Sequence, residues 1–311
     1  MNTLRGVIAA AATPLTDDHA IDLDRLVGHC NALLDEGGCD GINLLGTTGE
    51  ATSFSVEQRL GAMRAVAGSG LPLSRFMVGT GAAAFDDACR LTTEAKALGY
   101  AGALLLPPFY YKGIDPDAVV AYVTAVIERV GRDGLSLYLY HFPANSGVPY
   151  APEAVARLRD RFPETLKGLK DSTGDLDYSG GLARSLPGFD VFPSAEASIG
   201  RAAELGLAGC ISATANVTGR FAQAAFTGRS HEERSQALAE AVRIRGEIAR
   251  FPLVAAVKET LALLSGDAIW RRMMPPLEPL AAPDREALAK ALASTALFEE
   301  RPARGMAGRS A

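Results

Sequence analysis

Residues 102–140, GALLLPPFYYKGIDPDAVVAYVTAVIERVGRDGLSLYLY, form one strand-helix-strand pattern. Gly102 to Leu106 and Leu135 to Tyr140 are short apolar runs, which are typical of buried strands. Between them, Pro116 to Val130 carries apolar residues at three- and four-residue spacing, which predicts a helix. Pro116 suits a helix start because its missing amide hydrogen costs little there, and Gly131 suits a left-handed cap after the end. Such alternation predicts a parallel sheet covered by helices.

The same alternation runs through most of the chain. Eight apolar runs predict strands: Gly6 to Ala12, Gly41 to Leu45, Arg75 to Gly79, Gly102 to Leu106, Leu135 to Tyr140, Thr165 to Leu169, Phe189 to Phe192 and Gly206 to Ile211. Helical patterns separate most of them: Leu23 to Glu36, Val56 to Ala67, Asp86 to Leu98, Pro116 to Val130, Pro152 to Arg161 and Ala195 to Leu205. Eight units in about 220 residues favour an α/β fold of the closed (β/α)8 TIM barrel type over an open sheet.

After the eighth run the chain is helical throughout. The predicted helices cover Phe221 to Phe226, Ser230 to Ala249, Leu253 to Ser265 and Asp284 to Leu297. We therefore expect a catalytic barrel at residues 1–232 and a C-terminal helical extension at residues 233–311. Arg5 followed by Val7 to Ala12 also resembles a short signal peptide, but an amphipathic helix follows closely, so a first buried strand is the preferred interpretation.

Composition and charge exclude several classes of protein. The 311 residues are 48% hydrophobic and 22% charged, which excludes a disordered chain. A net charge of −5 offers no bulk basic surface for nucleic acid, and no apolar run approaches the length of a membrane span. Four cysteines form no CxxC pair and lie in apolar runs, which indicates reduced core thiols and a cytoplasmic protein: Cys30, Cys39, Cys89 and Cys210.

Polar residues follow several of the predicted strands, at the barrel end where active sites of this fold lie. Lys170 ends the apolar stretch of the sixth strand. Burial there disfavours its charged form, and a neutral amine is the form that attacks a keto carbon. Tyr140 ends the adjacent strand, which suits a proton-transferring hydroxyl. The alternatives are a lysine that reaches solvent or pairs with Asp171, and a core tyrosine with a satisfied hydroxyl.

The second predicted strand leads into Gly46-Thr47-Thr48-Gly49-Glu50. Two hydroxyls and closely spaced amides between glycines suit a small carboxylate, although an ordinary turn with a capping threonine has the same pattern. This segment lacks the lysine of a phosphate-binding Walker loop, and Gly79-Thr80-Gly81 lacks the third glycine of a dinucleotide fingerprint. His231-Glu232-Glu233 has no second histidine at zinc-protease spacing. We expect neither a metal nor a dissociable cofactor.

Taken together, these motifs resemble the dihydrodipicolinate synthase and N-acetylneuraminate lyase family of class I, pyruvate-handling aldolases. The likeness covers nearly the whole chain and rests on Gly46 to Glu50, Leu139-Tyr140 followed by Pro143 and Gly147, Gly168 to Asp171, and Cys210 to Val217. It implies that Lys170 forms a Schiff base with pyruvate or another 2-keto acid and that Tyr140 moves the proton. It further implies that Thr47 and Thr48 hold the pyruvate carboxylate and that the carbonyl of Ile211 faces the pocket.

The resemblance also implies a homotetramer in which Thr47 relays protons to a tyrosine of a neighbouring subunit. Spacing from Thr47 makes this tyrosine Tyr110, with Tyr111 as the alternative because the run from Pro107 to Tyr111 can slip by one residue.

One departure from the family pattern bears on the substrate. Synthases that make dihydrodipicolinate carry an arginine two residues after the proline of the tyrosine strand, where this chain has Asn145. A neutral amide cannot replace a guanidinium at a carboxylate. We therefore expect a lyase that joins pyruvate to an aldehyde or releases both from 4-hydroxy-2-oxoglutarate or a 2-keto-3-deoxy sugar acid. The alternatives are 4-hydroxy-tetrahydrodipicolinate synthase, a 2-keto-3-deoxy acid dehydratase, and a non-catalytic keto-acid-binding protein, which would need no proton relay.

Overall fold

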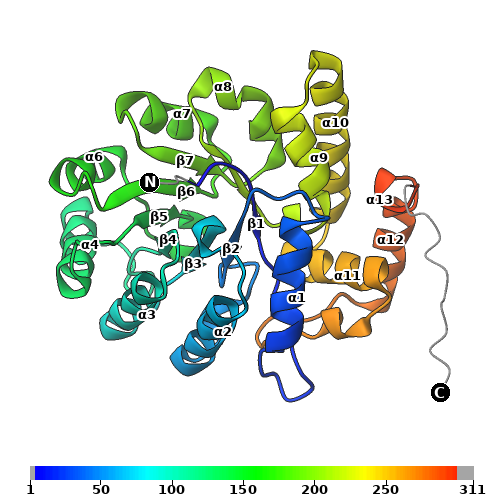
Figure 1. The fold of residues 1–311 in the computed structure, drawn as a ribbon, viewed down its shortest axis with the longest axis horizontal. Helices are drawn as coiled ribbons and strands as arrows, with labels where there is room; N and C mark the ends of the chain where they lie inside the picture. The colour runs from blue at the N-terminus through cyan, green and yellow to red at the C-terminus, as the bar shows by residue number, and fades with distance from the viewer. Residues whose placement is uncertain (1–3, 300–311) are drawn as a thin grey trace.

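The computed structural model describes residues 4–299 and contains the predicted (β/α)8 TIM barrel (Figure 1). Eight parallel strands follow the order β7-β6-β5-β4-β3-β2-β1-β8. A backbone hydrogen bond of 3.0 Å from Ala208 N–H to the Val191 carbonyl joins the two ends of this order. The strands are β1 (Gly6–Ala10), β2 (Gly41–Leu44), β3 (Phe76–Gly79), β4 (Gly102–Leu105), β5 (Leu137–His141), β6 (Leu166–Asp171), β7 (Asp190–Pro193) and β8 (Gly209–Ser212).

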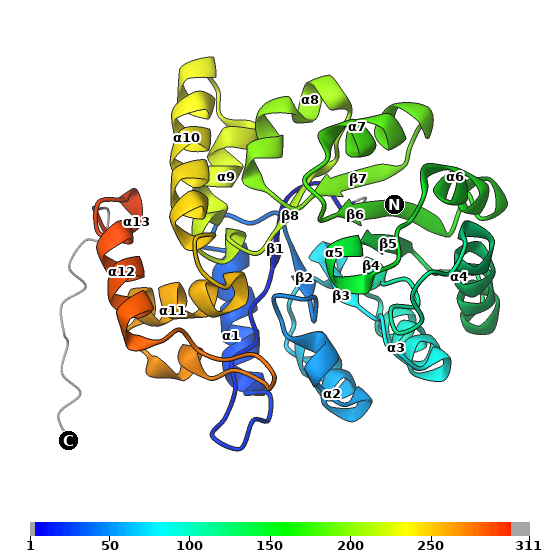
Figure 2. The same cartoon turned by 180° about the vertical axis from the view of Figure 1, so that it is seen from behind.

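Helices surround the barrel on its outer side (Figures 1 and 2). They are α1 (Leu23–Leu34), α2 (Val56–Gly68), α3 (Phe85–Leu98), α4 (Pro116–Val130), α6 (Pro152–Arg161), α7 (Leu176–Ser185), α8 (Ala202–Leu205) and α9 (Ala215–Thr227), with short helical turns η1 (Ala51–Ser53), η2 (Leu73–Arg75) and α5 (Pro143–Ser146) in the loops. The sequence patterns did not predict α7. The helix predicted from Ala195 begins instead as the 3₁₀ helix η3 (Glu196–Arg201). Gly131 follows α4 at φ 83° and ψ 137°, outside the predicted left-handed conformation.

The C-terminal helices lie together on one side of the barrel, against α1 and α9 (Figures 1 and 2). They are α10 (His231–Ile248), α11 (Leu253–Ser265), η4 (Ala268–Arg271), α12 (Ala282–Leu292) and α13 (Ala296–Glu299). The single helix predicted for Asp284 to Leu297 is wrong, because α12 ends at Leu292 and a turn precedes α13. The predicted boundary after residue 232 lies inside α10 and stays a prediction, and residues 300–311 of the predicted extension lie outside the described residues.

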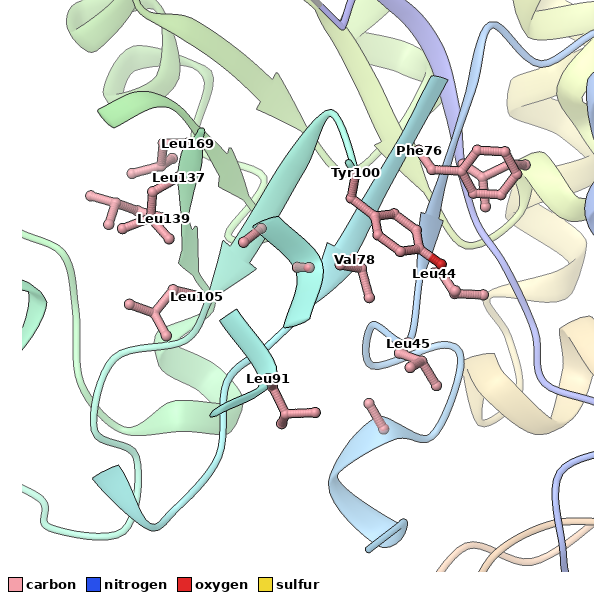
Figure 3. Close-up of a cluster of buried hydrophobic side chains, with 14 of the residues drawn as sticks. Leu44, Leu45, Phe76, Val78, Leu91, Tyr100, Leu105, Leu137, Leu139 and Leu169 are labelled. Atoms are coloured by element: carbon pink, nitrogen blue, oxygen red, sulfur yellow. The ribbon is translucent and has the colours of Figure 1, made fainter. Parts of the chain in front are cut away.

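Side chains on the strands alternate between two buried layers. Those that face outward belong to the large cluster between the strands and the surrounding helices, and Figure 3 draws Leu137 and Leu139 of β5 and Leu91 of α3 among its members. Tyr138 and Tyr140 of β5 belong instead to the cluster inside the barrel. The two-residue period of a strand requires this alternation, and it turns every second side chain of β5 toward the barrel axis.

The register between β5 and β6 places the two main candidate residues side by side. Tyr140 pairs with Lys170, and Tyr138 pairs with Gly168. A Cβ atom at position 168 would lie 2.8 Å from the Tyr138 ring, so glycine is required for the tyrosine to fit inside the barrel. Because Tyr140 and Lys170 lie near the C-terminal ends of their strands, their side chains meet at the barrel mouth.

Asn216 fastens the junction between β1 and β8. Its Nδ2 donates to the carbonyls of Ala10 and Ala213, each at 2.7 Å. Its Oδ1 accepts from the amide of Ala12 at 3.0 Å and lies 2.8 Å from His29 Nε2. Asn216, which belongs to the motif from Cys210 to Val217, therefore helps to close the barrel.

Residues Gly6 to Ala10 form strand β1, which pairs with β2 on one side and β8 on the other. This agrees with the preferred interpretation of the segment as a buried strand and not a signal peptide.

Candidate active site

A cavity of about 710 Å³ opens at the C-terminal ends of the strands. Its size lies within the usual range for small-molecule sites. It brings together six residues that the sequence singled out: Thr47, Thr48, Tyr140, Asn145, Lys170 and Ile211. They come from four loops or strand ends that are far apart in the chain, so the barrel topology alone makes them neighbours.

Lys170 is buried, with 3% of its surface exposed, and its Nζ lies 4.4 Å from the centroid of the Tyr140 ring. The neighbouring Asp171 faces the other side of β6, where its carboxylate accepts from the hydroxyls of Thr173 and Ser179, each at 2.8 Å. The alternative ion pair between Lys170 and Asp171 is therefore absent from the described part of the chain. The amine is left in contact with an aromatic face inside a cavity, where a carbonyl compound can reach it.

The hydroxyl of Tyr140 lies 3.1 Å from the hydroxyl of Thr47, within hydrogen-bonding distance. Phe142 supports the tyrosine through a stacked contact with ring centroids 5.8 Å apart. The two hydroxyls form a short chain that begins beside the lysine and ends in the β2 loop. Such a chain can hold a proton close to the amine or carry it away.

The loop that carries Thr47 and Thr48 has an unusual backbone. Leu45 and Glu50, on either side of the threonines, have φ angles of 53° and 56°, in the left-handed region that non-glycine residues rarely occupy. Such strain persists where surrounding contacts hold the conformation, and it is often found at functional sites. The contacts around this loop must therefore offset the free energy cost of its strained backbone.

The contact that holds the loop is an ion pair that sequence reasoning missed. Glu50 Oε1 lies 2.6 Å from Nζ of Lys258 in α11, and both side chains are fully buried. Glu50 Oε2 accepts from the amide of Met274 at 2.6 Å. Burial lowers the pKa of Lys258, while the adjacent Glu50 opposes this shift. The C-terminal helices thereby fix the end of the threonine loop.

Much of the cavity wall also comes from the C-terminal helices. The residues are Arg245 of α10, Pro252 to Ala255 at the start of α11, Met273, Pro276 to Ala281 in the segment before α12, and Asp284. No sequence pattern predicted this wall, because these residues follow no predicted strand. The region expected to be an appendage of the barrel therefore shapes the binding cavity.

A buried carboxylate, Glu196, organises the wall near Arg245. Its Oε1 accepts from three hydroxyls, those of Ser212 at 2.9 Å, Thr214 at 2.6 Å and Thr218 at 2.7 Å. Its Oε2 lies 3.3 Å from Arg245 Nη1. The same Nη1 lies 3.1 Å from Ser212 Oγ and 2.9 Å from Thr214 Oγ1. This network holds the guanidinium in a fixed position.

Tyr110 and Tyr111 lie apart from this group. They are 72% and 70% exposed, in the loop between β4 and α4, and they are not among the described residues that line the cavity. Their rings contact each other at 5.4 Å between centroids. The predicted relay to one of them requires a second copy of the chain, so this role stays a prediction.

Residues 4–299 also bear on metals, membranes and disulfides. Among them, no group of three or more His, Cys, Asp or Glu side chains could hold a metal ion. No helix in this range has the length and apolar character needed to span a membrane. The four cysteines are free and buried, and burial raises the pKa of the Cys30 and Cys39 thiols to about 12.

Comparison with known proteins supports the resemblance that the motifs indicated. The sequence model of the dihydrodipicolinate synthetase family matches residues 3–295. An uncharacterized DapA-like lyase from Chloroflexus aurantiacus is 36% identical over 223 residues, which cover 71% of this chain and 74% of the relative. The crystal structure of dihydrodipicolinate synthase from Agrobacterium tumefaciens superposes with a TM-score of 0.85 at 28% identity, covering 94% of this chain and 99% of the other.

A variant of 2-keto-3-deoxygluconate aldolase from Sulfolobus solfataricus has a TM-score of 0.82 over 92% of this chain and 94% of the other. At 22% identity this likeness concerns the fold.

Proposed function

The chain belongs to the dihydrodipicolinate synthetase family, and on that premise we propose that it is a class I aldolase that holds a 2-keto acid as a Schiff base on Lys170. The observation that carries the proposal is the buried Lys170 amine, 4.4 Å from the Tyr140 ring, in one cavity with the hydroxyl pair of Tyr140 and Thr47. A protein that only bound keto acids would have no use for that proton path.

In the proposed reaction, the Lys170 amine attacks the keto carbon of pyruvate, and the keto oxygen leaves as water to give an iminium ion. Loss of a proton from the methyl carbon turns the iminium ion into an enamine. The enamine carbon then attacks the aldehyde carbon, a carbon-carbon bond forms, and the aldehyde oxygen takes up a proton to become a hydroxyl. Water finally hydrolyses the iminium ion and restores the amine. Tyr140 holds and returns the protons.

The remaining side chains are proposed to orient the keto acid and complete the relay. Thr47 and Thr48 bind its carboxylate through hydroxyls and amides, and the Ile211 carbonyl faces the same space. Tyr110 of a neighbouring copy, or Tyr111, continues the proton path from Thr47 in a homotetramer. The high exposure of both rings supports a role at a subunit contact. Buried, unpaired thiols support a cytoplasmic setting.

Asn145 supports a substrate other than aspartate semialdehyde. It lines the cavity and offers an amide where family synthases carry a guanidinium. We propose cleavage or formation of 4-hydroxy-2-oxoglutarate or a 2-keto-3-deoxy sugar acid. The second candidate is 4-hydroxy-tetrahydrodipicolinate synthase, favoured by the likeness to the Agrobacterium synthase over 94% of the chain. A dehydratase on 2-keto-3-deoxy acids would share the enamine and expel water in place of the aldehyde.

Borohydride reduction in the presence of pyruvate, followed by peptide mass spectrometry, tests the proposal. We expect a reduced pyruvyl adduct on Lys170 and none in Lys170→Ala, which should remain folded by circular dichroism. Absence of any adduct on the wild-type protein would exclude the class I mechanism and favour a keto-acid-binding protein. Product masses from pyruvate and a panel of aldehydes then separate the candidates, and efficient condensation with aspartate semialdehyde would overturn the Asn145 argument.

A further inference from the structure

Arg245 contributes a guanidinium from α10 to the cavity that also contains Lys170. Its side chain is 21% exposed, and Nη1 makes its contacts with Glu196, Ser212 and Thr214. A guanidinium has five N–H donors, of which three belong to Nε and Nη2. Within residues 4–299, all side-chain hydrogen bonds of Arg245 are donated by Nη1, and neither Nε nor Nη2 has a partner. The group is therefore held firmly on one side and retains donors for a bound molecule.

Glu196 is unsuited to binding the substrate itself. It is fully buried, three hydroxyls occupy its Oε1, and Arg245 lies against its Oε2. Its main effect on the cavity is to fix Arg245 and to place one negative charge behind it. That charge repels a dianion such as a phosphate more strongly than a singly charged carboxylate, and a carboxylate also matches the two adjacent donors of a guanidinium edge.

Charge in the cavity points to the same ligand group. Of the described residues that line it, Lys170 and Arg245 have positive side chains, and Glu278 and Asp284, both exposed, have negative ones. In the proposed function, Lys170 reacts with the keto carbon, and Thr47 and Thr48 bind the first carboxylate. Asn145 carries no charge. A second carboxylate on the substrate would therefore find its counter-charge at Arg245.

We propose that Arg245 binds a carboxylate on the aldehyde half of the substrate, so that the enzyme acts on dicarboxylic 2-keto acids. The proposal rests on the proposed function and narrows its substrate class. Under this proposal, Arg245 determines the specificity for the aldehyde. It lies in α10, one of the C-terminal helices, and not at the end of a barrel strand.

The test compares aldehydes that differ in charge. Condensation with pyruvate is measured for glyoxylate and for glycolaldehyde, its neutral two-carbon counterpart, with succinic semialdehyde as a longer carboxylate. We expect the wild-type enzyme to prefer at least one of the carboxylates by kcat/KM. Arg245→Gln should reduce that preference about 100-fold, mainly through the KM of the aldehyde, because the charge-assisted pair is lost. Arg245→Lys keeps the positive charge but loses the two adjacent N–H donors of the guanidinium, so its preference for the carboxylate should lie between those of the wild type and Arg245→Gln.

The design separates a specificity role from a structural one. Both aldehydes are assayed on the same preparation, so a partly unfolded fraction cancels from the ratio of their kcat/KM values. Arg243→Gln is the matched control, since Arg243 pairs with Glu240 on the surface of the same helix and should leave the ratio unchanged. If Arg245→Gln does not fold, Arg245→Lys still supplies a cation to Glu196 and carries the test.

The outcomes distinguish this proposal from the one on which it rests. Failure of borohydride to trap pyruvate on wild-type Lys170 would remove the proposed function. Successful trapping together with an equal loss of activity toward glyoxylate and glycolaldehyde in the Arg245 variants would overturn the carboxylate assignment alone. A wild-type preference for glycolaldehyde over both carboxylates would overturn it as well.

Discussion

Tyr140 stands between the Lys170 amine and the Thr47 hydroxyl, 3.1 Å from the latter. In the proposed reaction its hydroxyl moves protons at several steps, so Tyr140→Phe should lower kcat by about two to four orders of magnitude. Tyr138→Phe is the matched control, because this tyrosine lies on the same strand and inside the same cluster but does not line the cavity. Steady-state rates at saturating pyruvate measure the effect, and an unchanged rate in Tyr140→Phe would refute the proton-transfer role.

Glu50 illustrates how a single buried charge sets the shape of the site. Glu50→Gln should lower the free energy of unfolding by about 3 to 5 kcal/mol, because it removes the negative charge that pairs with the buried Lys258 amine. Urea unfolding measures the change. The double variant Glu50→Gln with Lys258→Met should recover part of the loss, since no unpaired charge remains. A double variant as unstable as the sum of both single variants would show that the pair does not interact as described.

At the residue scale, site residues could be predicted where they lie at the end of a predicted strand. Lys170, Tyr140 and Thr47 each lie at or just after the end of an apolar run, and the barrel fold turns such positions toward one mouth. Arg245 carries no comparable signal, because an arginine on an amphipathic helix normally faces solvent. Its position depends on how α10 packs against η3 and on its contact with Ser212 of β8, and no local sequence pattern predicts such contacts between distant segments.

At the scale of elements, the strands were predictable, and among the longer helices around the barrel α7 was not. The α7 sequence LDYSGGLARS contains Gly180 and Gly181, which disfavour helix formation. The helix forms because Asp175 caps it, accepting from the amides of Asp177 at 2.9 Å and Tyr178 at 3.0 Å. A Cβ at position 180 would also lie 3.0 Å from Leu205, so the glycine permits close packing. Capping and packing thus outweigh local propensity.

A buried histidine, His29, lies where α1 contacts α9 and η4, and it should make the free energy of unfolding depend on pH. His29 of α1 lies 2.8 Å from Asn216 and contacts Trp270 edge to face, and burial lowers its pKa to about 4. Because the unfolded chain binds this proton at its ordinary pKa near 6.5, stability from His29 is complete above pH 6.5 and is lost as the pH falls toward 4. The free energy of unfolding that His29 contributes should fall by about 3 kcal/mol once the pH is below the pKa of the folded state.

Urea unfolding of wild type and His29→Gln at pH 7 and pH 4.5 measures this effect. The variant should show a smaller decline in unfolding free energy between the two values, since glutamine does not titrate. Exposed His231→Gln is the control and should decline as the wild type does. Equal declines in all three proteins would assign the pH dependence to other groups.

At the scale of the whole molecule, barrel and C-terminal helices share both a core and a cavity. The apolar cluster under α10 to α12 includes Ala12 and Ala213 from the barrel strands' ends. The buried pair of Glu50 and Lys258 crosses the same junction. The helical patterns after the eighth apolar run predicted an extension of this size, but the shared burial depends on long-range packing. The two predicted parts are therefore expected to fold together.

The chain's single tryptophan, Trp270, provides a probe of this junction, because it lies in η4 and contacts His29 of α1. Its fluorescence reports on the C-terminal helices, whereas far-ultraviolet circular dichroism reports on the whole chain. If the two parts share one core, both signals should change at the same urea concentration with the same steepness, as a single cooperative transition requires.

An earlier fluorescence change, with the circular dichroism signal largely retained, would mean that the C-terminal helices detach from a stable barrel. It would support a domain boundary near residue 232. Activity should then disappear with the fluorescence, because the cavity would lose the wall that contains Arg245.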